Sequence, residues 1–150
     1  MNILITEEQF KRIYLNNLEG FKSAMDNYHE YGIFYHGTSN PKISELILPP
    51  IETKTISEKG RKKNLDKVFF TKSYKSAQIY AGRAFNSYGG IKRVLPIIPI
   101  GKVEIINSNK GSEVFMADYA IVINENEPIE KQIIEYFKIK LNSNHLFPKP

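Results

Sequence analysis

The chain contains no cysteine, and this absence excludes several kinds of site. Without thiols there is no disulfide and no thiolate zinc site. No apolar run reaches the 18 or more residues of a membrane-spanning helix. Residues 1–5 form too short an apolar run for a secretion signal and lack a basic start. We therefore expect a single cytoplasmic domain over residues 1–150, with no metal and no membrane partner.

Glycine-rich nucleotide motifs are also missing, since the chain has neither a Rossmann fingerprint nor a P-loop. Hydrophobic residues make up 41% and aromatic residues 12% of the chain, enough to build a packed core. The net charge of +5 is unevenly placed, because residues 59–75 hold seven cations and one acid. This basic segment could attract phosphates or an acidic partner, or it could be a solvated loop. Its cations are Lys59, Arg61, Lys62, Lys63, Lys67, Lys72 and Lys75.

Apolar spacing and turn residues predict the elements of the first half. Thr6 resembles a helix cap, and the apolar residues that follow at helical spacing predict a helix over about 6–28. Residues 33–36 are expected to form a buried strand after Gly32. A short helix is expected over 43–48, followed by a polar surface loop over 51–66.

The second half alternates strands with helices, so the fold class is α+β. We expect a strand at 68–71, a helix from Ser73 to about residue 85, strands at 94–100 and 102–106, and a core strand over 113–123. Pro96 and Pro99 argue that the strand at 94–100 is an edge strand or has interrupted pairing. Turns are expected at 86–90 and 107–111, and a C-terminal helix at 128–141, with Ile134 in its apolar stripe, before a loose tail. The domain would then comprise an N-terminal helix (1–30), a core (33–123) and a C-terminal helix.

Three short segments carry residues that can perform chemistry at strand ends. They are Tyr35-His36-Gly37-Thr38, then Val68-Phe69-Phe70-Thr71 with the following Ser76-Ala77, and Ser112-Glu113-Val114-Phe115. Their order, histidine then aromatic then glutamate, resembles the His-Tyr-Glu branch of the ADP-ribosyltransferases. The first segment is similar to rifampin ADP-ribosyltransferases and RNA 2′-phosphotransferases, and the other two to poly(ADP-ribose) polymerases. The resemblance implies a split antiparallel sheet and NAD as the substrate.

The resemblance also implies which residues bind NAD. His36 would hydrogen-bond a ribose hydroxyl, with Thr38 beside it in the same motif, and the backbone of Gly37 would hold the nicotinamide carboxamide. Phe69 and Tyr80 would stack on the two faces of the nicotinamide ring, whose positive charge favours aromatic partners. The family usually has tyrosine where this chain has Phe69, and Tyr80 fits only with a one-residue offset.

Glu113 is the carboxylate that the resemblance makes catalytic, together with His36. Cleavage of the nicotinamide bond passes through an oxocarbenium-like transition state, which a nearby carboxylate stabilises. Asp118 competes for this role, because the rifampin-type enzymes carry Asp at the third position. We favour Glu113, because it opens its strand and can reach a cleft.

These residues together predict a mono-ADP-ribosyltransferase that releases nicotinamide, as a small bacterial or phage-encoded effector. The acceptor is expected to be a protein, with a nucleic acid or a small molecule as the other classes. Arginine is disfavoured as the modified residue, because Gly111 stands where arginine-directed toxins carry a second Glu or Gln. The alternatives are an NAD-dependent RNA 2′-phosphotransferase and a non-catalytic NAD-binding module, and NAD hydrolysis to free ADP-ribose also stays open.

Overall fold

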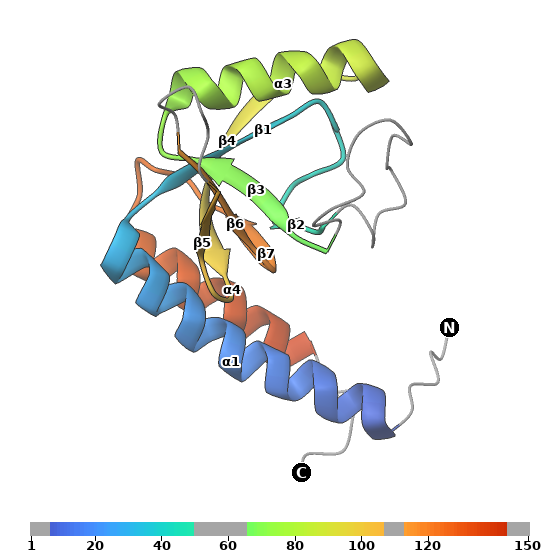
Figure 1. Ribbon diagram of the computed structural model, residues 1–150. Coiled ribbons are helices and arrows are strands. Elements are labelled where there is room, and N and C mark those ends of the chain that lie inside the picture. The colour runs from blue at the N-terminus through green and yellow to red at the C-terminus, as the bar shows by residue number, and fades with distance from the viewer. Residues whose placement is uncertain (1–6, 50–65, 107–112, 144–150) are drawn as a thin grey trace.

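A computed structural model describes residues 7–49, 66–106 and 113–143, and within them the chain has the α+β fold class that the sequence predicts. Seven strands form one antiparallel sheet in the order β2-β7-β4-β1-β3-β6-β5 (Figure 1). The strands are β1 (Phe34–Thr38), β2 (Leu46–Ile47), β3 (Val68–Thr71), β4 (Arg93–Ile100), β5 (Glu104–Ile106), β6 (Val114–Ala117) and β7 (Tyr119–Val122). The helices are α1 (Glu7–Tyr31), α3 (Tyr74–Tyr88) and α4 (Ile129–Ser143).

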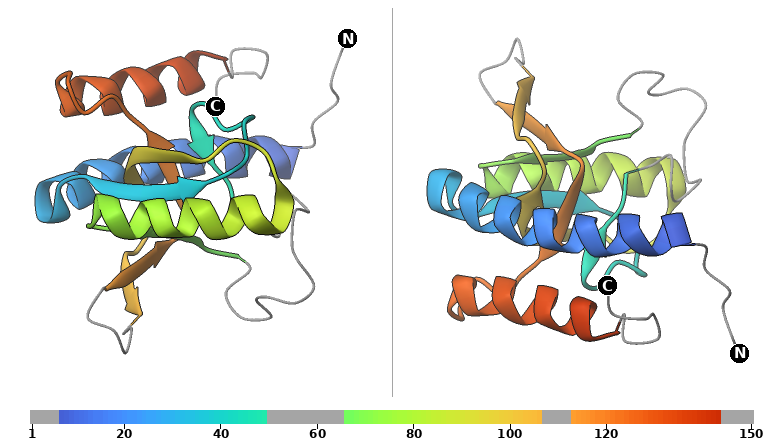
Figure 2. Two further views of the ribbon diagram at one scale, coloured as in Figure 1. Left: turned by 90° about the horizontal axis from the view of Figure 1, so that it is seen from above. Right: turned by 90° about the horizontal axis from the view of Figure 1, so that it is seen from below.

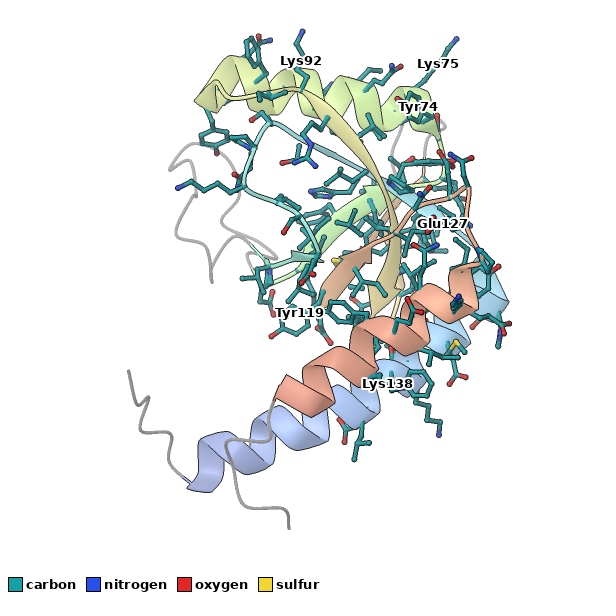
Figure 3. All side chains as sticks on the ribbon, turned by 180° about the vertical axis from the view of Figure 1, so that it is seen from behind. Tyr74, Lys75, Lys92, Tyr119, Glu127 and Lys138 are labelled. Carbon is teal, nitrogen blue, oxygen red and sulfur yellow. The ribbon has the colours of Figure 1, made fainter. Side chains whose placement is uncertain are left out.

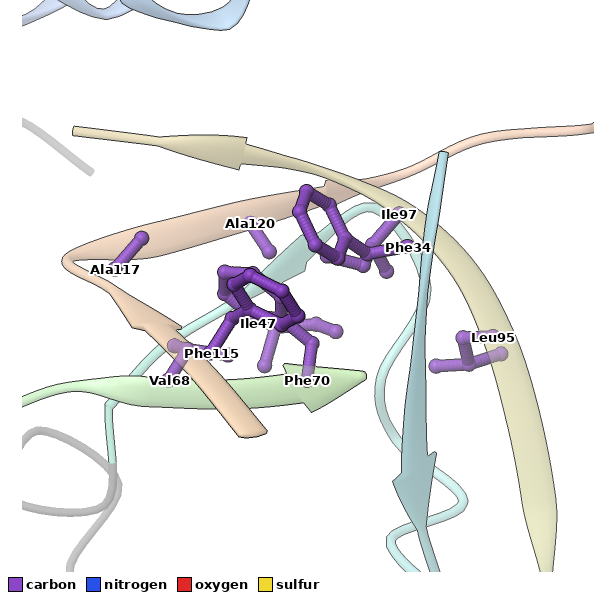
Figure 4. Packing of buried hydrophobic residues seen from close by; sticks show 9 residues of the cluster. All are labelled: Phe34, Ile47, Val68, Phe70, Leu95, Ile97, Phe115, Ala117 and Ala120. Carbon is purple, nitrogen blue, oxygen red and sulfur yellow. The ribbon is translucent and has the colours of Figure 1, made fainter. Parts of the chain in front are cut away.

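The inner face of the sheet forms the main hydrophobic core. Phe34 on β1 lies at its centre, with ring centroids 4.7 Å from Phe70 on β3 and 4.9 Å from Phe115 on β6 (Figure 4). Ile97 on β4 and Ala120 on β7 belong to the same cluster. The strands on the two sides of β1 therefore fold toward each other and share one apolar interior.

Helices cover the outer face in two places. α3 lies over β1, where its buried residues Ala77 and Ala81 meet Gly37 (Figure 2). α1 and α4 pack together against the other half of the sheet, where Ile98 and Ile121 contact residues of both helices. The chain thus places α3 apart from the α1–α4 pair, on the other side of the molecule (Figure 1).

The predicted helices are confirmed, with changes at their ends. α1 continues to Tyr31, three residues beyond the prediction. Ser73 caps α3 as expected, because its side chain accepts a hydrogen bond from the Ser76 amide. In α4 the residues Ile129, Ile133 and Phe137 are buried, but Ile134 is 45% exposed and does not belong to the apolar stripe.

Two element predictions are wrong. Residues 43–48 form no helix; Leu46 and Ile47 instead pair with β7 as an edge strand, which their apolar side chains suit equally well. The core strand predicted over 113–123 is two strands, β6 and β7, separated by a bend at Asp118. β6 pairs with β3 and β5, whereas β7 pairs with β4 and β2, so the chain changes its position in the sheet at this bend.

The prolines of β4 lie in a central strand with interrupted pairing, which is one of the two predicted arrangements. β1 pairs with β4 up to Ile97, and β7 pairs with it from Ile97 onward. The Pro99 carbonyl accepts a hydrogen bond from the Asn27 side chain, on the side where the β1 ladder has ended. Because the N and O of one strand residue point to the same side, the Pro99 nitrogen faces this gap and no ladder bond is lost.

Strands 68–71 and 102–106 are confirmed as β3 and β5, the latter starting at Glu104. α3 continues to Tyr88, so the turn expected from residue 86 begins later. The turn at 107–111, the tail from 144 and almost all of the loop predicted at 51–66 lie outside the described residues.

Candidate functional site

The three sequence segments lie on three neighbouring strands. β3 pairs with β1 on one side and with β6 on the other, and Tyr35, Thr71 and Val114 stand in one row across them. β1 and β3 are paired at this single position, whereas β3 and β6 are paired along four residues. β1 and β3 therefore diverge directly after Tyr35, and the split begins at His36.

The side chain of His36 bridges this split. Its Nδ1 lies 2.6 Å from the carbonyl oxygen of Phe69. A carbonyl oxygen only accepts hydrogen bonds, so Nδ1 carries the proton and Nε2 is the nitrogen with a lone pair in the neutral ring. This tautomer suits Nε2 to accept a hydrogen bond from a hydroxyl group, as the predicted ribose contact requires.

His36 and Glu113 share the inner face of the sheet. His36 lies on β1 between the buried Phe34 and Thr38, and by strand alternation all three side chains face inward. Glu113 is exposed and directly precedes β6, so the same alternation gives it the face of Phe115. β3 lies between them in the sheet, so the two side chains are set apart by the width of one strand.

Thr38 is buried, and its Oγ1 accepts a hydrogen bond from the Asn40 amide at 3.1 Å. This short-range bond shapes the turn that leaves β1. Its predicted contact with NAD stays a prediction.

Gly37 and Phe69 lie on the opposite, outer face. A Cβ on Gly37 would lie 2.0 Å from the Ala77 carbonyl oxygen, so glycine here lets the α3 backbone approach β1. Phe69 shares this face by alternation, while its carbonyl holds His36. The predicted NAD-binding residues thus come from both faces, and a ligand that touches all of them must lie where β1 and β3 diverge.

Tyr80 lies on α3, half-buried, with the Arg83 guanidinium 5.6 Å from its ring centroid. It follows Ala77 by about one helical turn, on the flank of α3 rather than on the side that faces β1. Tyr80 therefore lies on the same helix as Ala77 and Ala81, which contact Gly37. Its role in stacking on nicotinamide remains a prediction.

Asp118, the alternative carboxylate, has a structural partner away from His36. Its Oδ1 lies 2.5 Å from the Lys67 Nζ at the bend between β6 and β7. The hydrogen bond to Asp118 raises the pKa of Lys67, partly opposed by burial. Asp118 also lines a groove of about 1060 Å³ beside α1 and α4 that contains none of the other predicted site residues.

The basic segment is only partly described, because residues 59–65 lie outside the described part of the chain. Lys67 belongs to the ion pair above. The Lys72 ammonium donates to the carbonyl oxygens of Tyr31 and Ile33, next to the end of α1, and lies 4.2 Å from the Phe34 ring centroid. Desolvation lowers the pKa of Lys72. The contacts of these two cations therefore stabilise the fold, a role that composition alone does not show.

A second polar contact near the split was not predicted from the sequence. The Tyr35 hydroxyl donates to Glu125 at 2.8 Å, and the Tyr35 ring packs edge-on against Tyr74 of α3. This hydrogen bond raises the pKa of Tyr35. The only signal in the sequence was the outward position of Tyr35 on its strand, which says nothing of a partner 90 residues away.

In the described part of the chain, three or more His, Asp or Glu side chains nowhere gather as a metal site would require. The described helices include none with the length and apolar character needed to cross a membrane. Comparison of the chain with protein-family models, with curated proteins and with solved structures returned no match.

Proposed function

We propose that this protein is an NAD-dependent mono-ADP-ribosyltransferase, with a split sheet of the ADP-ribosyltransferase type. NAD would lie across the divergence of β1 and β3. His36 would bind a ribose hydroxyl through Nε2, and Glu113 would stabilise the positive charge that develops when the nicotinamide bond breaks.

The adjacency of the three motif strands carries this proposal. His36, Phe69 and Glu113 are distant in the sequence, yet β1, β3 and β6 are consecutive in the sheet. His36 and Glu113 face the same side across β3, and the hydrogen bond that His36 Nδ1 donates to the Phe69 carbonyl selects the His36 tautomer that accepts at Nε2. NAD has two riboses separated by a pyrophosphate, so two polar residues set apart on one face suit its two ends.

Purified protein mixed with NAD tests the proposal, with released nicotinamide measured by chromatography. We expect slow release alone and faster release when a cell lysate supplies the acceptor. Binding without release under both conditions would assign the chain to the non-catalytic alternative. Neither binding by calorimetry nor release with lysate present would refute the proposal.

Glu113→Gln identifies the catalytic carboxylate. The substitution keeps the size of the side chain and removes its charge, so turnover should fall roughly 10²–10³-fold while NAD binding is retained. Glu127→Gln is the matched control, because Glu127 is also exposed but lies in the turn before α4. Equal activity in the two variants would remove Glu113 from the mechanism.

A further inference from the structure

The net positive charge of the chain comes from one continuous segment. Residues 67–103 contain seven Lys and Arg and no Asp or Glu. The whole chain has 21 cationic and 16 acidic residues, so outside this segment acids outnumber cations by two. The excess positive charge therefore belongs to the segment that forms β3, α3 and β4, of which α3 lies on the side of the molecule away from α1 and α4 (Figure 1).

Three of these cations are exposed on α3 and the loop after it: Lys75, Arg83 and Lys92. Lys75 and Lys92 lie apart along this part of the molecule (Figure 3). Lys67 and Lys72 are held by the contacts described above, and Arg93 donates to the Ile43 carbonyl. The seventh, Lys102, lines the groove beside α1 and α4. The acid Glu125 lies close to the first turn of α3, because its partner Tyr35 packs against Tyr74 there.

Large apolar side chains are exposed on α3 and on the loop after it. Ile79 is 57% and Ile91 58% exposed, and Tyr74, Phe85 and Tyr88 are exposed as well. The core does not need them, because α3 is anchored to β1 through the small residues Ala77 and Ala81. Exposed apolar groups gathered in one place indicate an interaction surface.

Two aromatic rings of α3 each have a cation beside them. The Arg83 guanidinium lies 5.6 Å from the Tyr80 ring centroid, and the Lys92 ammonium lies 5.2 Å from that of Phe85. Tyr80 and Phe85 are about 140° apart around the helix, so the apolar groups do not form the single stripe that a membrane-surface helix requires. Exposed rings with cations beside them are typical of surfaces that stack bases and hold phosphates.

We propose that the surface formed by α3 and residues 89–92 binds single-stranded nucleic acid. Its cations contact the phosphates, and its exposed aromatic rings stack on bases without strong sequence preference. Resting on the proposed function, the bound strand is also the acceptor of ADP-ribose. α3 begins three residues after Thr71, which stands in one row with Val114, the neighbour of Glu113. The first turn of α3 therefore lies at the end of the sheet where Glu113 precedes β6, and a nucleic-acid strand along α3 has one of its ends there.

Fluorescence anisotropy of the full chain with labelled 20-mers of thymidine and of uridine tests the surface without NAD. The triple variant Lys75→Ala, Arg83→Ala, Lys92→Ala should bind at least tenfold more weakly at 50 mM salt. The logarithmic salt slope should change by about 2, since each single-strand phosphate contact contributes roughly 0.7. Phe85→Ala should weaken binding roughly fivefold or more at every salt concentration, with the slope unchanged.

The matched control removes three exposed lysines from α1 and α4, by Lys22→Ala, Lys131→Ala and Lys138→Ala. It should change the affinity less than twofold. Equal losses in the two triple variants would overturn the proposal, because binding would then follow net charge alone. Binding to phosphatidylserine vesicles with no binding to either oligonucleotide would overturn it in favour of a membrane surface.

Labelled NAD added to the bound oligonucleotide tests the acceptor role separately. Transfer of label to the strand, lost in the α3 triple variant while slow nicotinamide release continues, is the expected result. Nicotinamide release with no labelled strand would overturn the acceptor role and leave the proposed function standing. Oligonucleotide binding with no NAD consumption, with or without lysate, would refute the proposed function and leave the binding surface standing.

Discussion

The His36 imidazole and the Phe69 carbonyl meet across the split between β1 and β3, with 2.6 Å between Nδ1 and the oxygen. The backbone ladder between these strands has one pair, at Tyr35 and Thr71, and the next connection is this side-chain hydrogen bond. One residue therefore joins the two strands and is aimed at the place where they separate.

The first prediction concerns the His36 tautomer and its effect on stability. Long-range ¹H–¹⁵N NMR should show the proton on Nδ1 in the neutral ring. His36→Leu removes the donor to Phe69 and should lower the free energy of unfolding by about 1 kcal/mol. His36→Gln, which keeps an N–H donor, should lose less. A proton on Nε2 in the free protein would contradict the assignment.

Gly37 and Gly82 offer a matched pair of substitutions. Ala at position 37 would place Cβ 2.0 Å from the Ala77 carbonyl oxygen and 2.7 Å from the Ala81 nitrogen. Both are backbone atoms of α3, so the helix must move, and we expect a loss of roughly 2–4 kcal/mol.

A Cβ on Gly82, inside the same helix, meets nothing within 4 Å. Gly82→Ala should therefore raise stability by about 0.5–1 kcal/mol, because alanine loses less conformational freedom in a helix than glycine does. Urea unfolding of both variants measures the difference. Gly37→Ala with the stability of the wild type would show that α3 does not approach β1 this closely.

Asp118→Asn should separate the two candidate carboxylates. The Lys67–Asp118 pair is partly exposed, at 24% and 49% for the two side chains, so its loss should cost about 0.5–1 kcal/mol at neutral pH. Because the pKa of Lys67 is raised, this contribution is present below the ordinary lysine pKa and is lost as the pH rises through the folded value. Nicotinamide release should be unchanged. Loss of release in Asp118→Asn, with Glu113→Gln active, would reverse the assignment.

Local patterns predicted most of the helices and strands because they depend on neighbours in the sequence. Ser73 could be recognised as a cap, since its partner is the Ser76 amide three residues later. Strand order depends on distant partners, and the apolar run through Asp118 therefore looked like one strand. Its division became visible only when β6 and β7 were seen to pair with different neighbours.

The candidate site was predictable in its residue types and less so in its geometry. The sequence indicated that His36 ends an apolar run on a strand. Counted from the buried Phe34 two residues earlier, strand alternation places His36 on the inner face. The sequence assigned Gly37 to a ligand, whereas the missing Cβ makes room for the backbone of α3. A glycine that allows close approach does not reveal what approaches, and this information resides in Ala77 and Ala81, forty residues away.

The last prediction uses Tyr136, whose pKa burial raises to about 12, with a smaller effect of the nearby Glu45. The folded state then keeps the phenol proton to higher pH than the unfolded chain, whose tyrosines ionise near pH 10. The stability that this pKa difference contributes is therefore fully present below pH 10 and is lost as the pH rises toward 12. Between pH 8 and 11 the full shift would cost about 1.4 kcal/mol, and the partial exposure of the ring reduces this to roughly 0.7 kcal/mol. We therefore expect the free energy of unfolding to fall less in Tyr136→Phe than in the wild type between pH 8 and pH 11, by roughly 0.7 kcal/mol. Urea unfolding of both proteins at the two pH values measures this difference. Parallel losses in the two proteins would show that the Tyr136 hydroxyl titrates as it does in the unfolded chain.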